Sequence, residues 1–292
     1  MPILSGRARI AGLLGWPVAH SRSPRLHGFW LERYGIDGAY VPLATPPASL
    51  PAAIRGLAAA GFAGCNVTIP HKEAAARLCD ALTGEARRIA AVNTLVFRDG
   101  KIHGSSTDGA GFLAGLRAHG VDPAAGPALV LGAGGAARAV VATLLEAGAR
   151  VSITNRTPGR AEGLCRLFPT LRPLAWEARN AALADVALLV NTTAAGMLGV
   201  PALEVDLSRA PATLAVADIV YAPQETPLLA AAKARGLTIV PGLGMLLHQA
   251  VPGFEAWFGI RPCVDQELIA FIAADLAADA GRSREPDRTR DE

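Results

Sequence analysis

The chain has 292 residues, 51% of them hydrophobic and 18% charged, and is long enough for one large or two ordinary globular domains. Its formal charge of +3 is modest, and its basic residues form no block along the sequence of the kind that binds nucleic acid or an anionic membrane. No apolar run reaches the roughly 18 residues of a membrane span, and the N-terminus lacks a signal sequence, so we expect a cytoplasmic protein that acts on a small molecule.

The first part of the chain reads as an α/β domain. The segments ARIAGLLG, AYVPLAT and GCNVTI, starting at residues 8, 39 and 64, have the composition of strands. The segment NTLVFRDGKIHGSS, residues 93–106, predicts a hairpin that turns at Asp99 and Gly100.

Lys72 follows the third of these strands in the stretch GCNVTIPHK. Pro70 cannot continue a central strand, so Lys72 is expected where the strand gives way to the helix suggested by EAAARLCD. The helix dipole disfavours a cation at that end by about 0.3 to 1 kcal/mol, which indicates another reason for the lysine. A solvated lysine in the first helical turn is the alternative.

Between residues 111 and 242, apolar runs of strand type alternate with helical stretches, which implies βαβ units and a parallel sheet covered on both faces. After Pro241 the pattern is helical to about residue 279, and this helical pair is expected to pack on the first domain. We therefore predict two α/β domains with a cleft between them, the C-terminal one a Rossmann-like doubly wound parallel sheet. The substrate domain would be residues 1–107 plus 243–280, the cofactor domain 108–242, and 281–292 a disordered tail.

A glycine-rich turn, LVLGAGGAARA at residues 129–139, joins a strand to a helix in the second domain. Gly132 permits the tight turn, Gly134 lets the backbone approach a pyrophosphate, and Gly135 relaxes the turn. A tight turn that binds nothing is the alternative. The dinucleotide contacts predicted here are Gly132, Ala133, Gly134, Gly135 and Ala136.

The next strand ends in Asn155, Arg156 and Thr157, with Arg160 one helical turn further. An NAD site would carry an acid at this place, whereas arginine favours the 2′-phosphate of NADP. A solvated arginine pair at a helix start is the alternative.

Cysteines and histidines give no sign of a metal. The cysteines are scattered and no histidine has ligand spacing with an acid or a cysteine, so we predict no metal site. The residues considered are Cys65, Cys79, Cys165, Cys263, His20, His27 and His71.

Several separated motifs together resemble the shikimate dehydrogenase family over roughly residues 10–275. They are, in order, GWPVAHSRSPRLHG, GCNVTIPHK, AVNT, STDGAG, the glycine turn, NRT, NTTAAGM, DIVYAP with ETPLL, and GLGMLLHQA. The chain has Gly28 where the family commonly has asparagine, and Ser106 in a segment that more often reads NTD.

The resemblance implies a substrate site in the first domain. By their match to the family, Ser21 and Ser23 would bind the substrate carboxylate, although by sequence alone they are also good helix caps. Lys72 and Asp108 would be the catalytic pair, with helix capping as the alternative for Asp108. Ring hydroxyls would be held by Thr68, Asn93, Asp108 and Gln249, with Tyr221 lining the pocket.

Further cofactor contacts implied by the resemblance are Thr192, Met197, Gly244 and Met245. The implied reaction is the reversible reduction of 3-dehydroshikimate to shikimate with NADPH, in aromatic amino-acid biosynthesis. A quinate/shikimate dehydrogenase with dual substrate or NAD use is the nearest alternative, and a non-catalytic NADP-sensing or metabolite-sensing module is a more distant one. A homodimer is left open.

Overall fold

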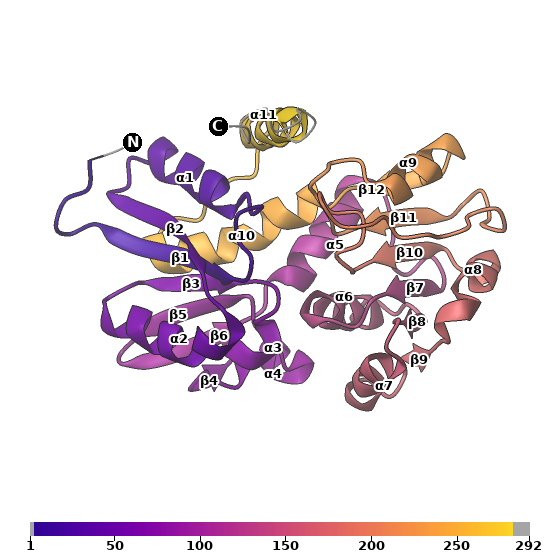
Figure 1. The fold of residues 1–292 in the computed structure, drawn as a ribbon, viewed down its shortest axis with the longest axis horizontal. Helices are drawn as coiled ribbons and strands as arrows, with labels where there is room; N and C mark the ends of the chain where they lie inside the picture. The colour runs from indigo at the N-terminus through magenta and orange to yellow at the C-terminus, as the bar shows by residue number, and fades with distance from the viewer. Residues whose placement is uncertain (1–2, 283–292) are drawn as a thin grey trace, which may run out of the picture.

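Two sheets lie at opposite ends of the molecule in the computed structural model, which describes residues 3–282 (Figure 1). The first sheet has the strand order β2-β1-β3-β5-β6-β4 and mixes parallel with antiparallel pairs. Its strands are β1 (Arg9–Gly15), β2 (Gly38–Ala44), β3 (Gly64–Val67), β4 (Ala81–Leu82), β5 (Thr94–Arg98) and β6 (Lys101–Ser105).

The hairpin predicted in this sheet is confirmed. Asp99 and Gly100 both have positive φ, 53° and 69°, as a two-residue turn with the right-handed strand twist requires. Strand β3 ends two residues earlier than predicted, at Val67, because Thr68 and Ile69 already belong to the turn that contains Pro70.

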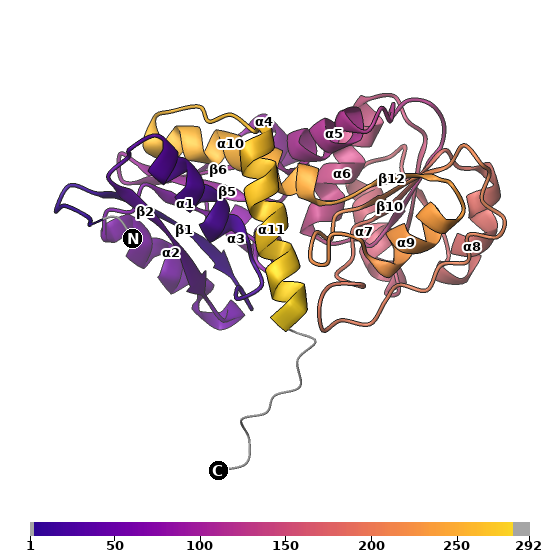
Figure 2. The same ribbon diagram turned by 90° about the horizontal axis from the view of Figure 1, so that it is seen from above.

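Helices cover both faces of the first sheet. Helices α1 (Ser23–Arg33) and α10 (Leu243–Phe258) pack on one face, and α2 (Leu50–Ala59), α3 (Lys72–Ala76) and α4 (Gly84–Ile89) lie on the other (Figure 1). Helix α11 (Gln266–Arg282) packs on α1 and is seen lengthwise in Figure 2. Residues 283–292 of the predicted tail lie outside the described residues.

The second sheet is parallel throughout, in the order β12-β11-β10-β7-β8-β9. Its strands are β7 (Ala128–Leu131), β8 (Val151–Thr154), β9 (Arg172–Pro173), β10 (Leu188–Asn191), β11 (Ala215–Asp218) and β12 (Thr238–Val240). Alternate residues face opposite cores: Ala128 and Val130 pack with α6 (Gly135–Glu146) and α7 (Pro158–Leu167), whereas Leu129 and Leu131 pack with α9 (Pro227–Ala234). This is the doubly wound sheet that the alternating pattern predicts.

Two helices connect the sheets. Helix α5 (Asp108–Ala118) leaves the first sheet and leads into β7, and α10 returns the chain from β12. They pack against each other in the middle of the molecule (Figure 2). The segments that follow β3, β7 and β10 lie against one another, because Gly135 is next to Lys72 and Gly132 is next to Thr192. None of the described helices is long and apolar enough to cross a membrane.

Candidate active site

Lys72 and Asp108 are the first residues of two helices that meet between the sheets. The Lys72 ammonium donates a hydrogen bond to Asp108 Oδ2, and the two form an ion pair. The side chains are only 14% and 5% exposed, so Lys72 is not the solvated lysine of the alternative interpretation. Asp108 is not a helix cap either, because Thr107 occupies the N-cap position and no side chain caps the helix. The Asp108 carboxylate is therefore free to orient the lysine.

Asn93 ties this pair to the rest of the site. Its Nδ2 donates to Asp108 Oδ1 at 2.9 Å, to Thr107 Oγ1 at 2.9 Å and to Gln249 Oε1 at 3.0 Å. The Thr107 hydroxyl donates to the Gln249 carbonyl at 2.7 Å, which brings in α10. Side chains from three distant segments of the sequence thus share one buried hydrogen-bond network, and such networks hold their members in one arrangement.

Asn66 extends the network and was not predicted from the sequence. It lies in β3, where every residue is buried, and its Nδ2 donates to the Asn93 carbonyl at 3.0 Å. The Tyr40 hydroxyl donates to Asn66 Oδ1 at 2.7 Å. An asparagine inside a short apolar strand is the sequence feature that could have indicated this role, because a buried amide needs partners.

Ser21 and Ser23 flank Arg22 at the start of α1. The Ser23 N–H donates to Ser21 Oγ at 3.2 Å, and no side chain caps the helix, so the capping alternative is not what the structure shows. Arg22 is buried and pairs with Asp275 at 2.9 Å and with Asp279, both on α11. Burial raises the pKa of the Tyr221 phenol, and a hydrogen bond with Ser21 partly offsets this, which places Tyr221 beside the serines.

Thr68 follows β3 directly, and its N–H donates to the Leu14 carbonyl at 2.9 Å. The Thr68 carbonyl accepts a hydrogen bond from the N–H of His71, the neighbour of Lys72, at 2.9 Å. Gln249, on α10, is joined to Asp108 through Asn93. Of the eight residues proposed for the substrate, four lie in helices α1, α3, α5 and α10, and the other four lie in the loops beside α1, β3, β5 and β11. The eight are Ser21, Ser23, Thr68, Lys72, Asn93, Asp108, Tyr221 and Gln249.

The glycine turn has the shape that a dinucleotide needs. Gly132 has φ +103°, and a Cβ there would lie 2.7 Å from Thr192 Oγ1, so only glycine fits. Gly134 is the N-cap of α6, with no side-chain cap and with open space where its Cβ would be. The first N–H groups of α6 are therefore available to an anion such as pyrophosphate.

Gly135 has a second role that the sequence did not indicate. A Cβ at this position would lie 2.8 Å from Lys72 Cβ and 3.2 Å from Lys72 Cδ. The stem of Lys72 therefore occupies the space of the missing side chain, and the glycine turn of one domain contacts the lysine of the other.

The segment after β8 presents two exposed arginines. Asn155 Nδ2 donates to the Thr157 carbonyl at 2.9 Å, which shapes the loop before α7. Arg156 and Arg160 are exposed, and within residues 3–282 neither forms an ion pair. Two guanidinium groups without an acidic partner, just after β8, suit the binding of a 2′-phosphate.

The remaining predicted cofactor residues differ in their exposure. Thr192 is buried and donates to the Leu131 carbonyl at 2.7 Å, whereas Met197 is half-buried in the loop that follows β10. Gly244 lies against Gly115 of α5. Met245 is buried in the hydrophobic core that β7 and α6 form.

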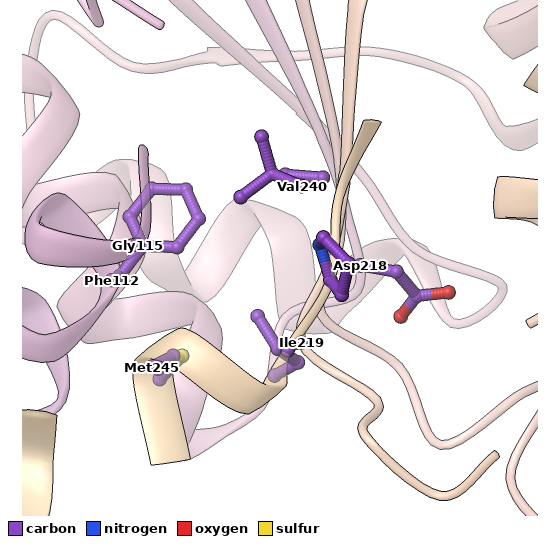
Figure 3. Close-up of a pocket in the computed structure, with 9 residues that line it drawn as sticks. Phe112, Gly115, Asp218, Ile219, Val240 and Met245 are labelled. Atoms are coloured by element: carbon purple, nitrogen blue, oxygen red, sulfur yellow. The ribbon is translucent and has the colours of Figure 1, made fainter. Parts of the chain in front are cut away.

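Met245 and Phe112 line a small cavity of about 10 Å³ beside the ends of β11 and β12 (Figure 3). The Asp218 carboxylate points away from this cavity and accepts hydrogen bonds from Asn191 Nδ2 at 3.0 Å and from the Thr226 hydroxyl at 2.7 Å. Burial raises the pKa of Asp218. Asp218 therefore organises the loops after β10 and β11 from within the core.

A parallel dinucleotide-type domain, a second α/β domain and a buried lysine–carboxylate pair between them define the class of two-domain nicotinamide-dependent oxidoreductases. Comparisons with known proteins narrow this class. Residues 13–95 match the family model described as shikimate dehydrogenase substrate binding domain, residues 120–225 that of shikimate/quinate 5-dehydrogenase, and residues 242–266 that of the shikimate 5′-dehydrogenase C-terminal domain.

Curated relatives match along nearly their whole length. The NADP(+) shikimate dehydrogenase of Acidiphilium cryptum is 65% identical over 94% of this chain and 99% of the relative, and that of Rhodospirillum rubrum is 56% identical over 92% and 99%. The crystal structure of shikimate 5-dehydrogenase from Thermus thermophilus in complex with NADP(H) and shikimate superposes with a TM-score of 0.79, at 40% identity over 94% of this chain and 99% of that one. The chain belongs to the shikimate dehydrogenase family.

Proposed function

We propose that this chain catalyses the reversible NADPH-dependent reduction of 3-dehydroshikimate to shikimate. Full-length relatives named NADP(+) shikimate dehydrogenase support the reaction and the cofactor. The observation that carries the proposal is the buried Lys72–Asp108 pair, which lies against the glycine turn of the cofactor domain. The pathway that this reaction serves is chorismate and aromatic amino-acid biosynthesis.

Lys72 and Asp108 divide the catalytic work. When bound, NADPH supplies a hydride to the ketone carbon of the substrate. Lys72 Nζ donates a hydrogen bond to the ketone oxygen and then a proton to the alkoxide that forms there. Asp108 holds Lys72 Nζ through its Oδ2, while its Oδ1 is fixed by Asn93. In the oxidation direction, the neutral amine of Lys72 accepts the proton of the substrate hydroxyl.

Polar side chains around this pair would orient the substrate. We assign Ser21 and Ser23 to its carboxylate, because hydroxyl groups near the start of α1 suit an anion. Thr68, Asn93, Asp108 and Gln249 would hold the ring hydroxyls, since hydroxyl, amide and carboxylate groups can form hydrogen bonds with them, and Tyr221 would line the same pocket. These assignments follow the resemblance to the family and the shared location of the residues.

The cofactor domain would hold NADPH along the edge formed by β7, β8 and β10. The N–H groups at the start of α6 would bind the pyrophosphate, and Arg156 with Arg160 the 2′-phosphate. We assign the nicotinamide end to the loops that carry Thr192 and Met197 and to Gly244 and Met245.

A spectrophotometric assay of the purified protein tests the proposal, with shikimate, with quinate and without substrate, each with NADP⁺ and with NAD⁺. We expect the highest specificity constant for shikimate with NADP⁺. Comparable rates with quinate and NAD⁺ would indicate a dual dehydrogenase instead. Binding of NADP⁺ without turnover of either acid would indicate a sensing module.

Localisation and oligomeric state complete the proposal. We propose that the enzyme works in the cytoplasm, where NADPH-dependent biosynthesis takes place. The sequence leaves a homodimer open, and light scattering coupled to size-exclusion chromatography decides between a monomer and a dimer.

A further inference from the structure

Arg138 connects the cofactor domain to the substrate domain at two points. It lies on α6, three residues after Gly135. Its Nη2 pairs with Glu73 Oε2 at 2.8 Å, and its Nη1 donates to the Ile89 carbonyl at 3.0 Å. The Arg138 and Glu73 side chains are 15% and 36% exposed, so water screens this half-buried pair less than it would a fully exposed ion pair.

Arg138 and Glu73 each lie close to a part of the proposed active site. Glu73 directly follows Lys72 in α3, and α6 begins at the glycine turn proposed to bind the pyrophosphate. The turn and the lysine also touch, because the Lys72 stem fills the space beside Gly135. The distance between the cofactor site and the amine is therefore set at this place.

Helix α3 needs such support, because five residues make little more than one turn, and a helix this short is not stable by itself. On its own domain, α3 is held by the hydrogen bond from the Val92 N–H to the Lys72 carbonyl at 3.0 Å and by the burial of Ala75 and Ala76 in the core. The Ile89 carbonyl ends α4, where a cation complements the helix dipole. The planar fork of Arg138 donates to the carbonyl through Nη1 and to the carboxylate through Nη2, a fixed geometry that the single ammonium group of a lysine does not reproduce.

We infer that Arg138 and Glu73 form a positioning pair that fixes Lys72 relative to the glycine turn. The pair touches neither the substrate nor the reacting atoms. It holds α3 and α4 against α6, so that the amine and the hydride donor meet at the same ketone group. The inference rests on the proposed function and adds to it two residues that the sequence did not indicate.

The chain offers a matched control. Arg88 and Glu146 pair at 2.6 Å and also join α4 to α6, but their side chains are 41% and 59% exposed. Glu146 lies eight residues beyond Arg138 on α6, about 12 Å further from the glycine turn at 1.5 Å per residue. Removing this second pair weakens the contact between α4 and α6 far from the glycine turn and leaves both contacts of Arg138 in place.

The test compares Glu73→Gln, Arg138→Lys and Arg138→Met with Arg88→Met and Glu146→Gln. Because a misplacement of about 1 Å can reduce a rate a hundredfold, we expect kcat to fall about 10- to 100-fold in Glu73→Gln and Arg138→Met. Arg138→Lys should retain an intermediate kcat.

The KM for shikimate and the dissociation constant for NADP⁺, measured by fluorescence titration, should stay within about threefold of the wild-type values, as expected when positioning rather than binding is lost. The double variant Glu73→Gln, Arg138→Met should be no slower than Arg138→Met alone, and kcat of the two control variants should stay within about twofold of the wild type.

Three results would overturn the inference. One is an unchanged kcat in Glu73→Gln and Arg138→Met, and another is an equal loss in the control variants. The third is a loss of activity that accompanies a raised dissociation constant for NADP⁺, which would make Arg138 a cofactor-binding residue.

If Arg138→Met does not fold, the kcat values of Glu73→Gln and Arg138→Lys test the inference instead. A wild type that binds NADP⁺ but does not oxidise shikimate would contradict the proposed function and this inference with it, whereas an active wild type with unchanged variants would contradict the inference alone.

Discussion

Lys72 is the residue whose removal separates chemistry from binding. We expect Lys72→Ala to lower kcat about a thousandfold or more, because the alkoxide loses both its hydrogen bond and its proton donor. The KM for shikimate should change far less, since Asn93, Gln249 and the serines remain. Steady-state kinetics measure both, with the exposed hairpin variant Lys101→Ala as a control. A kcat close to that of the wild type would rule out Lys72 as the proton donor.

Arg156 and Arg160 determine the choice of cofactor in the proposed site. Each charge-assisted hydrogen bond to a phosphate contributes about 1.5 to 3 kcal/mol, so the double variant Arg156→Ala, Arg160→Ala should lose a preference for NADP⁺ of about a hundredfold. Specificity constants for NADP⁺ and NAD⁺ measure this preference. Arg166→Ala, on the same helix α7, should leave it intact. An unchanged preference in the double variant would place the 2′-phosphate elsewhere.

His27 makes the stability of the protein depend on pH. The ring is fully buried and stacks on Tyr40 at 4.0 Å, and burial lowers its pKa to about 3. Since the unfolded chain binds this proton near pH 6.5, acidification favours unfolding between pH 6.5 and 3, by about 1.4 kcal/mol per pH unit. From pH 6.5 to 5, the wild type should therefore lose about 2 kcal/mol more stability than His27→Phe. Urea unfolding at both pH values measures this, and equal losses would contradict it.

The places of single residues in the fold were predictable from the sequence where a local motif fixes the backbone around them, whereas their roles in the site stay predictions. Lys72, Asp108 and the glycine turn lie at the ends of strands or the starts of helices, which the local pattern defines. Asn66 and Arg138 were missed because their partners come from other parts of the chain: Asn66 meets the backbone of Asn93, and Arg138 reaches from one domain into the other.

At the scale of elements, two helical glycines offer opposite expectations. Gly28, in α1, has open space where a Cβ would be, so Gly28→Ala should raise the free energy of unfolding by about 0.8 kcal/mol. Gly111, in α5, would place a Cβ 2.8 Å from Gln249 Cβ and from the Met245 carbonyl. Gly111→Ala should therefore destabilise the protein by about 1 to 3 kcal/mol. Chemical denaturation measures both, and stabilisation by Gly111→Ala would show that α5 and α10 can move apart at little cost.

The elements themselves were largely predictable. The βαβ alternation, the hairpin and the C-terminal helices follow the hydrophobic pattern, which burial on one or both faces imposes. Strand β9 (Arg172–Pro173) was missed because it has two exposed residues, and its strand conformation comes from pairing with β8 rather than from its own sequence. The bounds of the two domains stay a prediction.

For the whole molecule, the course of α10 predicts coupled unfolding of the two halves. Met245, at its start, belongs to the core of the cofactor domain, whereas Phe254 and Trp257 belong to the other core. Trp30 and Trp257 of the substrate domain contribute to the tryptophan fluorescence. We expect this fluorescence to change at the same denaturant concentration as far-UV circular dichroism. NADP⁺ should shift both midpoints together, because a ligand stabilises every part that unfolds with its site. A fluorescence midpoint that does not change with NADP⁺ would show that the two domains unfold independently.

The ion pairs of Arg22 have a practical consequence for anyone who expresses this protein. Arg22 lies between the two serines assigned to the substrate carboxylate, and its partners Asp275 and Asp279 are on the last helix. A shortened clone that stops before Gln266 would leave a buried guanidinium without its counterions and distort the loop that carries both hydroxyls. The junction to a purification tag or a fused protein therefore belongs after Arg282.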